Sequence, residues 1–222
     1  PGGTAHHLTL TGLTADTRYY YRLRYRAQGA PAYGVGPTYS FLTLPLTGGQ
    51  GRICVTTDIH VTNTTALGLQ SHLDLLRTSL DYMTGHEADG YHAWLDIGDL
   101  VVMRPQRTVF DIVDTEQRYR RAREWVESIA HSLPFVQSRG NHEEVNGWDY
   151  DGTPENITVW SGKNLVKYFP PPFPDEYYSG NSTAHPAIGI PGNYFSMRVG
   201  NLTLRGLDPY LPSVIRPHNA HN

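Results

Sequence analysis

Three short polar motifs follow three apolar runs at nearly even spacing, and this arrangement strongly limits the folds open to the chain. The motifs are Asp58-Ile59-His60, Gly98-Asp99 and Gly140-Asn141-His142-Glu143, and two or three residues separate each motif from the apolar run before it, at 53–55, 93–95 and 134–136. The steps of 41 residues from Asp58 to Asp99 and 42 from Asp99 to Asn141 each suit a strand, a crossover helix and a return strand. The sequence therefore predicts an α/β fold in which a parallel sheet brings the three motifs to one edge.

The donor types in these motifs favour a transition-metal site. A single Asp or His after a strand is more often a helix cap or a surface residue than a ligand. Five such residues in three converging loops make a functional site the better interpretation: Asp58, His60, Asp99, Asn141 and His142. Mixed carboxylate, imidazole and amide donors suit Zn, Mn or Fe better than an all-oxygen calcium site.

Two neighbouring acids have less certain roles. Asp96 precedes the second motif and is expected to be a hydrogen-bond partner at the strand end rather than a ligand. Glu143 either supports His142 from behind or is an exposed acid favoured by a helix N-terminus, and the sequence leaves both alternatives open.

The ordered motifs resemble the signature of the calcineurin-like metallophosphoesterases, D-x-H, then G-D, then G-N-H-[DE]. The resemblance implies that Asp58 and His60 bind a first metal, that Asp99 bridges two metals and that Asn141 binds the second. It also implies that His142 is a catalytic acid and not a ligand. The implied cofactors are two transition-metal ions (Fe, Zn or Mn), and the implied substrate is a phosphate ester.

The first 45 residues narrow the resemblance. Alternating patterns predict strands at 7–13, 19–25 and 38–44, and Leu13-x-x-x-Thr17-x-Tyr19 looks like the tyrosine corner of a fibronectin type III or immunoglobulin-like sandwich. Three strands are too few for such a sandwich, so we expect residues 1–45 to be its C-terminal part. Residues 46–222 are then expected to be the N-terminal part of a phosphoesterase domain, a sandwich of mixed sheets flanked by helices. This order is similar to that of the purple acid phosphatases.

The sequence departs from the purple acid phosphatases at three points. Val102 stands where those enzymes carry the tyrosine whose phenolate colours the ferric centre, and His60 stands where they usually have glycine. We therefore expect a non-purple centre in which the imidazole replaces the phenolate. The later histidine and the G-H-x-H block of the family do not occur, and His218 and His221 lie in a different context.

Weaker signals concern the cellular compartment. Four N-x-[ST] sequons predict N-linked glycans and a secreted or other extracytoplasmic protein, at Asn63, Asn156, Asn181 and Asn201. The net charge of −3 gives no indication of nucleic-acid binding. The sequence contains no run of about 18 apolar residues, so it gives no indication of a membrane span. Homo-oligomerisation is left open.

Other segments are predicted to be scaffold. Helical spacing of apolar residues predicts crossover helices at 67–82 and 116–131, and residues 193–204 read as a hairpin. The resemblance implies that the aromatic and proline-rich segment 148–174 lies beside the metal pocket, where Trp148, Tyr150 and Tyr168 either shape it or simply pack.

The leading functional hypothesis is a metal-dependent phosphomonoesterase resembling acid phosphatases. The alternatives are a phosphodiesterase or nucleotide-cleaving enzyme, and an extracellular structural or adhesive glycoprotein that has kept the fold but lost activity. A downstream G-H-x-H in the full-length sequence would favour an enzyme.

Overall fold

The structure is a computed structural model that describes residues 6, 8–61, 78–79, 82, 91–102, 112–144, 153–172, 174–175 and 178–208. The fold is mixed α/β. Its elements are β1 (Arg18–Tyr25), β2 (Gly34–Leu42), β3 (Ile53–Thr56), β4 (Ala93–Asp96), α2 (Ile112–Ala130), β5 (Phe135–Gln137), α3 (Asn141–Glu144), α4 (Ile157–Tyr168), β6 (Tyr178–Gly180), β7 (Tyr194–Val199) and β8 (Leu202–Leu207).

The three apolar runs form the predicted parallel sheet, with strand order β3-β4-β5. The central strand β4 is buried along its whole length, as expected for a strand covered on both faces. Strand β3 lies at the edge of the described sheet and its Val55 is 55% exposed, although a short apolar run is typical of a buried strand. The apolar run alone could not distinguish an edge strand from a central one.

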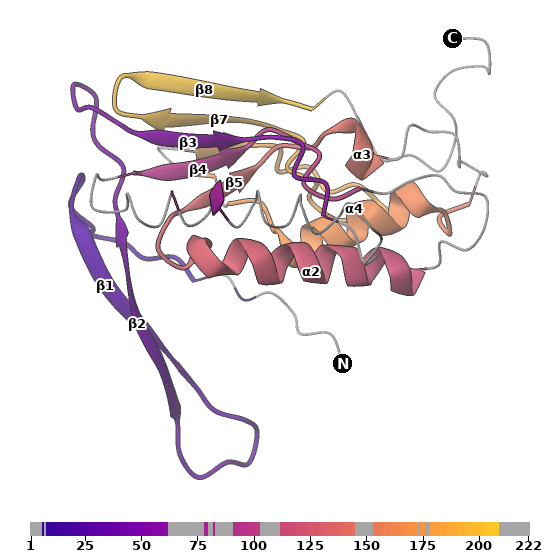
Figure 1. Ribbon diagram of the computed structural model, residues 1–222, viewed down its shortest axis with the longest axis horizontal. Coiled ribbons are helices and arrows are strands. Elements are labelled where there is room, and N and C mark those ends of the chain that lie inside the picture. Colours follow the sequence, from indigo (N-terminus) through magenta and orange to yellow (C-terminus); the bar gives the residue numbers. More distant parts are fainter. Residues whose placement is uncertain are drawn as a thin grey trace.

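Two hydrophobic cores cover the faces of this sheet. Trp94 on β4 points into a core shared with helices α2 and α4. Its neighbours Ala93 and Leu95 point the other way, into a core shared with the β6-β7-β8 sheet, because side chains alternate along a strand. Figure 1 shows helices α2 and α4 on one side of β3–β5 and the β7–β8 hairpin on the other. The predicted 193–204 hairpin is confirmed by the antiparallel pairing of β7 with β8.

The helices agree in part with the sequence. The helix expected at 116–131 is confirmed as α2, and its apolar stripe is buried: Tyr119, Ala122, Val126 and Ile129. The helix expected at 67–82 lies outside the described residues apart from 78, 79 and 82. Helix α4 was not predicted, and it occupies part of the segment expected to be a proline-rich insertion. No helix among the described residues is long and apolar enough to span a bilayer.

In the described part of the N-terminal region, the predicted strands at 19–25 and 38–44 correspond to β1 and β2, which pair as an antiparallel hairpin. Residues 8–13 form no strand, so the strand prediction was wrong there; alternation of apolar residues does not itself provide a pairing partner. The local contact of a tyrosine corner is present, since the Thr14 amide donates to the Tyr19 hydroxyl (2.8 Å). This two-stranded sheet and the single contact do not establish a fibronectin-like domain.

Candidate metal centre

The loops after β3 and β4 run side by side, because their main chains stay paired beyond the strand ends. The amides of Asp58, His60 and Val61 donate to the carbonyls of Gly98, Asp99 and Leu100, at 3.0, 2.9 and 2.7 Å. Backbone hydrogen bonds alone therefore hold the first two motifs next to each other.

The backbone in these two loops is strained at the residues expected to bind metal. Asp58, His60 and Asp99 have φ of 54°, 56° and 59°, and they are three of the four non-glycine residues with positive φ in the described chain. Such conformations cost a side-chain-bearing residue on the order of 1–3 kcal/mol and concentrate at functional sites. In this conformation the Asp58 and Asp99 carboxylates lie within 3.7 Å of His60 Nε2, and the sequence indicates it only through the tolerance of Asp and His for positive φ.

Two glycines allow the second and third motifs to approach each other. A Cβ on Gly98 would lie 2.7 Å from the Gly140 nitrogen, and a Cβ on Gly140 would collide with the Asp99 carboxylate. Gly98 also has φ of 124°, a conformation that favours glycine. The glycines of both motifs are therefore required by close backbone packing.

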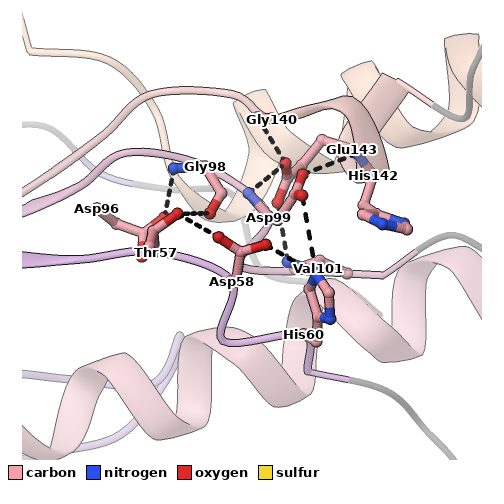
Figure 2. A network of polar contacts seen from close by, with 10 residues as sticks. All are labelled: Thr57, Asp58, His60, Asp96, Gly98, Asp99, Val101, Gly140, His142 and Glu143. Carbon is pink, nitrogen blue, oxygen red and sulfur yellow. Dashed lines mark hydrogen bonds and ion pairs between the residues drawn. The ribbon is translucent and has the colours of Figure 1, made fainter.

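The candidate ligand atoms converge on His60. Its Nε2 lies 3.6 Å from Asp58 Oδ1 and 3.7 Å from Asp99 Oδ2, as Figure 2 shows. Ligands 2.0–2.2 Å from one tetrahedral ion lie roughly 3.4 Å apart, so these spacings are close to what one ion requires. His60, Asp99 and His142 also offer ligand atoms within 4.8 Å of one another.

Two imidazole nitrogens support a cation at this point. His60 Nε2 and His142 Nδ1 are buried and have no hydrogen-bond partner, and the two rings lie 4.7 Å apart. A buried nitrogen without a partner costs on the order of 1–3 kcal/mol, whereas coordination would use its lone pair. The residues present therefore fit a transition metal.

The third motif begins the short helix α3. Asn141 is its first residue and is partly buried, and the His142 amide donates to Asp99 Oδ1 (2.8 Å). This bond leaves Asp99 Oδ2 directed toward His60. One carboxylate thus links the second and third motifs, an arrangement that suits the bridging role the resemblance implies.

The role of the Glu143 carboxylate differs from both alternatives that the sequence left open. It is 2% exposed, and its carboxylate accepts the amides of Asp99, Val101 and Gly140 at 3.0, 2.8 and 2.8 Å. Figure 2 shows these bonds converging on one side chain. Bonds of this kind to a charged acceptor are the stronger ones, so Glu143 fastens the second motif to the third.

Asp96 lies buried beneath the site, as expected for a hydrogen-bond partner. It accepts the Thr56 hydroxyl (2.9 Å) and the Gly98 amide (3.2 Å). Burial raises the pKa of Asp96 from its ordinary 3.8 to about 8, opposed by the Thr56 bond and reinforced by the charge of Glu143. Burial likewise raises the pKa of Glu143 to about 7.

These shifts predict that the metal-free protein loses stability as pH rises from about 4 to about 8. Below pH 4 Asp96 is protonated in both states, whereas above it the unfolded carboxyl ionises while the folded one keeps its proton. Urea unfolding at pH 5, 6.5 and 8 should show falling midpoints, with a shallower fall in Asp96→Asn because only Glu143 then contributes. Glu124→Gln on the surface of α2 is the control, and an unchanged slope in Asp96→Asn would contradict the assignment.

The four predicted glycosylation sites remain predictions. Asn63 lies outside the described residues, and Asn201 is exposed. Asn181 is partly buried, with its amide nitrogen bonded to Asn193. Asn156 caps helix α4 and is 3% exposed, and its amide nitrogen donates to the Thr153 carbonyl (2.7 Å). A glycan on this nitrogen would have to enter a buried position, whereas the capping atom is Oδ1, which accepts the Val159 amide (3.1 Å).

The other predicted residues lie away from the centre or outside the description. Tyr168, a candidate for the pocket wall, ends α4 and donates its hydroxyl to Glu116 on α2 (2.8 Å), which is a packing role. Trp148, Tyr150, His218 and His221 lie outside the described residues.

Comparison with known proteins supports the fold. No family model matches the sequence, and no curated protein sequence matches it significantly. Among solved structures the chain is similar to purple acid phosphatase PPD1 from yellow lupin (Lupinus luteus) seeds, with a TM-score of 0.61 and 18% identity. The match covers 91% of this chain and 32% of that phosphatase, so the chain spans about a third of its length. The likeness confirms the α/β fold, and at this identity it shows the fold alone.

Proposed function

We propose that this chain carries the metal centre of a metal-dependent phosphomonoesterase. The observation that carries the proposal is the convergence of Asp58, His60, Asp99 and His142 at the edge of a parallel sheet, with two imidazole nitrogens lacking partners. The order of the motifs and the fold shared with a purple acid phosphatase support it. Two transition-metal ions, when bound, would supply charge neutralisation for the phosphate and an activated water.

The residues of the chain have distinct roles in this proposal. Asp58, His60 and Asn141 hold cations, and Asp99 is shared between them. His142 donates a proton to the departing ester oxygen, which is a poor leaving group as an alkoxide. Glu143 keeps the loops of Asp99 and His142 at a fixed separation.

The test is hydrolysis by the full-length protein after chelation and again after adding back Zn, Mn or Fe. A phosphate monoester and a diester of the same phenol separate the two enzymatic alternatives, and we expect metal-dependent cleavage that favours the monoester. Arg205→Gln, on the exposed face of β8, is the matched control and should keep full activity. Preference for the diester would support the phosphodiesterase alternative. A protein that binds metal but cleaves neither ester would support the non-enzymatic scaffold.

The centre is also expected to be colourless. Val102 is 2% exposed and cannot supply a phenolate, so iron bound here lacks the charge-transfer partner that gives purple acid phosphatases their colour. Visible spectra of the iron-loaded protein should show no strong band between green and red. Such a band would mean that a tyrosine elsewhere binds the iron.

A further inference from the structure

The N-terminal region that contains the β1–β2 hairpin is positively charged, whereas the rest of the chain is acidic. Residues 1–51 contain four arginines and one acid, Asp16, which gives a formal charge of +3, whereas the whole chain has −3. Figure 1 shows the hairpin projecting from the α/β body. Its positive charge is therefore presented at a distance from the acidic remainder of the protein.

The arginines form a single row. Arg18, Arg22 and Arg24 occupy alternate positions of β1 and so share one face of the ribbon. The register irregularity between Arg22 and Arg24 places its extra residue on β2, so the alternation along β1 is kept. Arg22, Arg24 and the following Arg26 are exposed.

Uncharged groups complete the same face. The β2 residues paired with Arg18 and Arg22 are Leu42 and Thr38, so no acid opposes the row from the neighbouring strand. Tyr20 lies between the two arginines on this face and is 72% exposed. The face combines a line of cations with one accessible aromatic ring.

Part of the row is preorganised. The guanidinium groups of Arg24 and Arg26 lie 5.4 and 4.7 Å from the centre of the Tyr33 ring. A guanidinium stacked on a ring keeps its N–H edge available for anions. Fixing these long side chains in advance lowers the entropy lost when a ligand binds.

We propose that this arginine row, formed by Arg18, Arg22, Arg24 and Arg26 with Tyr20, binds an acidic polysaccharide. Eight residues of strand extend about 26 Å, so the row fits a linear polyanion lying along the ribbon. Guanidinium forks pair with carboxylate or sulfate groups, and the exposed Tyr20 ring can pack on the apolar face of a sugar.

Two other polyanions fit less well. A single-stranded nucleic acid stacks successive bases on aromatic side chains. This face of β1 offers one ring, Tyr20, and the nearby Tyr33 ring is already packed against Arg24 and Arg26. A membrane surface presents its anionic headgroups over a plane, whereas this hairpin carries its cations in a single line, because β2 contains no charged residue. The proposal does not depend on the phosphatase function.

Binding to immobilised heparin and to polygalacturonate tests the proposal and separates sulfate from carboxylate recognition, with neutral dextran as the blank. The full-length protein should bind at least one acidic polymer and elute with salt. The double variant Arg22→Gln/Arg24→Gln should bind about tenfold more weakly or worse. Arg120→Gln/Arg205→Gln removes the same charge from α2 and β8 and should bind like the wild type.

Several outcomes would overturn the proposal. These are no binding to either acidic polymer, an equal loss in the control pair, and displacement by single-stranded DNA at lower concentration than by the polysaccharide. Circular dichroism of both double variants checks that folding is intact. Asp99→Ala should leave polysaccharide binding unchanged, so failure of this proposal and failure of the phosphatase proposal are distinguishable.

Discussion

Replacing Asp99 by alanine should abolish tight binding of both metal ions. Asp99 is the carboxylate that both ions would share, and two cations close together repel each other unless such a group lies between them. The side chain is placed for this role, because one oxygen accepts the His142 amide (2.8 Å) and the other lies 3.7 Å from His60 Nε2. Elemental analysis after dialysis should find less than one ion per chain.

Matched variants separate charge from shape in this experiment. Asp99→Asn keeps an oxygen for the His142 amide but removes the charge, and it should also lose metal. Asp58→Asn should lose chiefly one ion, because the Asp58 side chain is 60% exposed and the candidate ligand that its carboxylate approaches is His60 (3.6 Å). Glu124→Ala removes a carboxylate from the surface of α2 and should change nothing. An Asp99→Ala protein that still holds two ions would exclude the bridging role.

The His142→Ala variant should keep its metals and lose roughly two to four orders of magnitude in kcat on alkyl phosphates. A much smaller loss is expected on aryl phosphates, because a phenolate leaves without needing a proton. His142 is held by its backbone bond to Asp99, and its Nδ1 is buried without a hydrogen-bond partner. A general acid and a metal ligand both lower activity when removed, but only the acid produces a loss that depends on the leaving group.

The geometry makes this comparison necessary. His142 lies close enough to His60 and Asp99 to be a third ligand of the same ion, whereas the resemblance assigns it as an acid. Equal losses on both substrate classes, together with the loss of one ion, would reassign His142 as a ligand. Arg205→Gln again serves as the unaffected control.

The structure reproduces the predictions that rest on apolar patterns and on the spacing between them. The three apolar runs, their parallel pairing and helix α2 followed from periodicity and from the length that a crossover requires. Convergence of the motif loops followed from the same topology. A parallel sheet allows few other arrangements once the strands are assigned.

The features that sequence reasoning missed depend on contacts between distant residues. Glu143 looks like an ordinary first-turn acid, and only the fold shows its carboxylate accepting three backbone amides. Asn156 was interpreted as a glycan acceptor, although Asn is also a preferred helix N-cap and could have revealed α4. The left-handed backbone at Asp58, His60 and Asp99 has no sequence pattern beyond the tolerance of Asp and His for that region.

Anomalous X-ray diffraction from crystals of the full-length protein grown with Zn or Mn tests the central claim most directly. The account predicts two peaks on either side of the Asp99 carboxylate. One should lie about 2.0–2.2 Å from ligand atoms of Asp58 and His60, and the other should be in contact with Asn141. A map with no peak at Asp99, measured on crystals soaked in excess metal, would contradict the proposed centre.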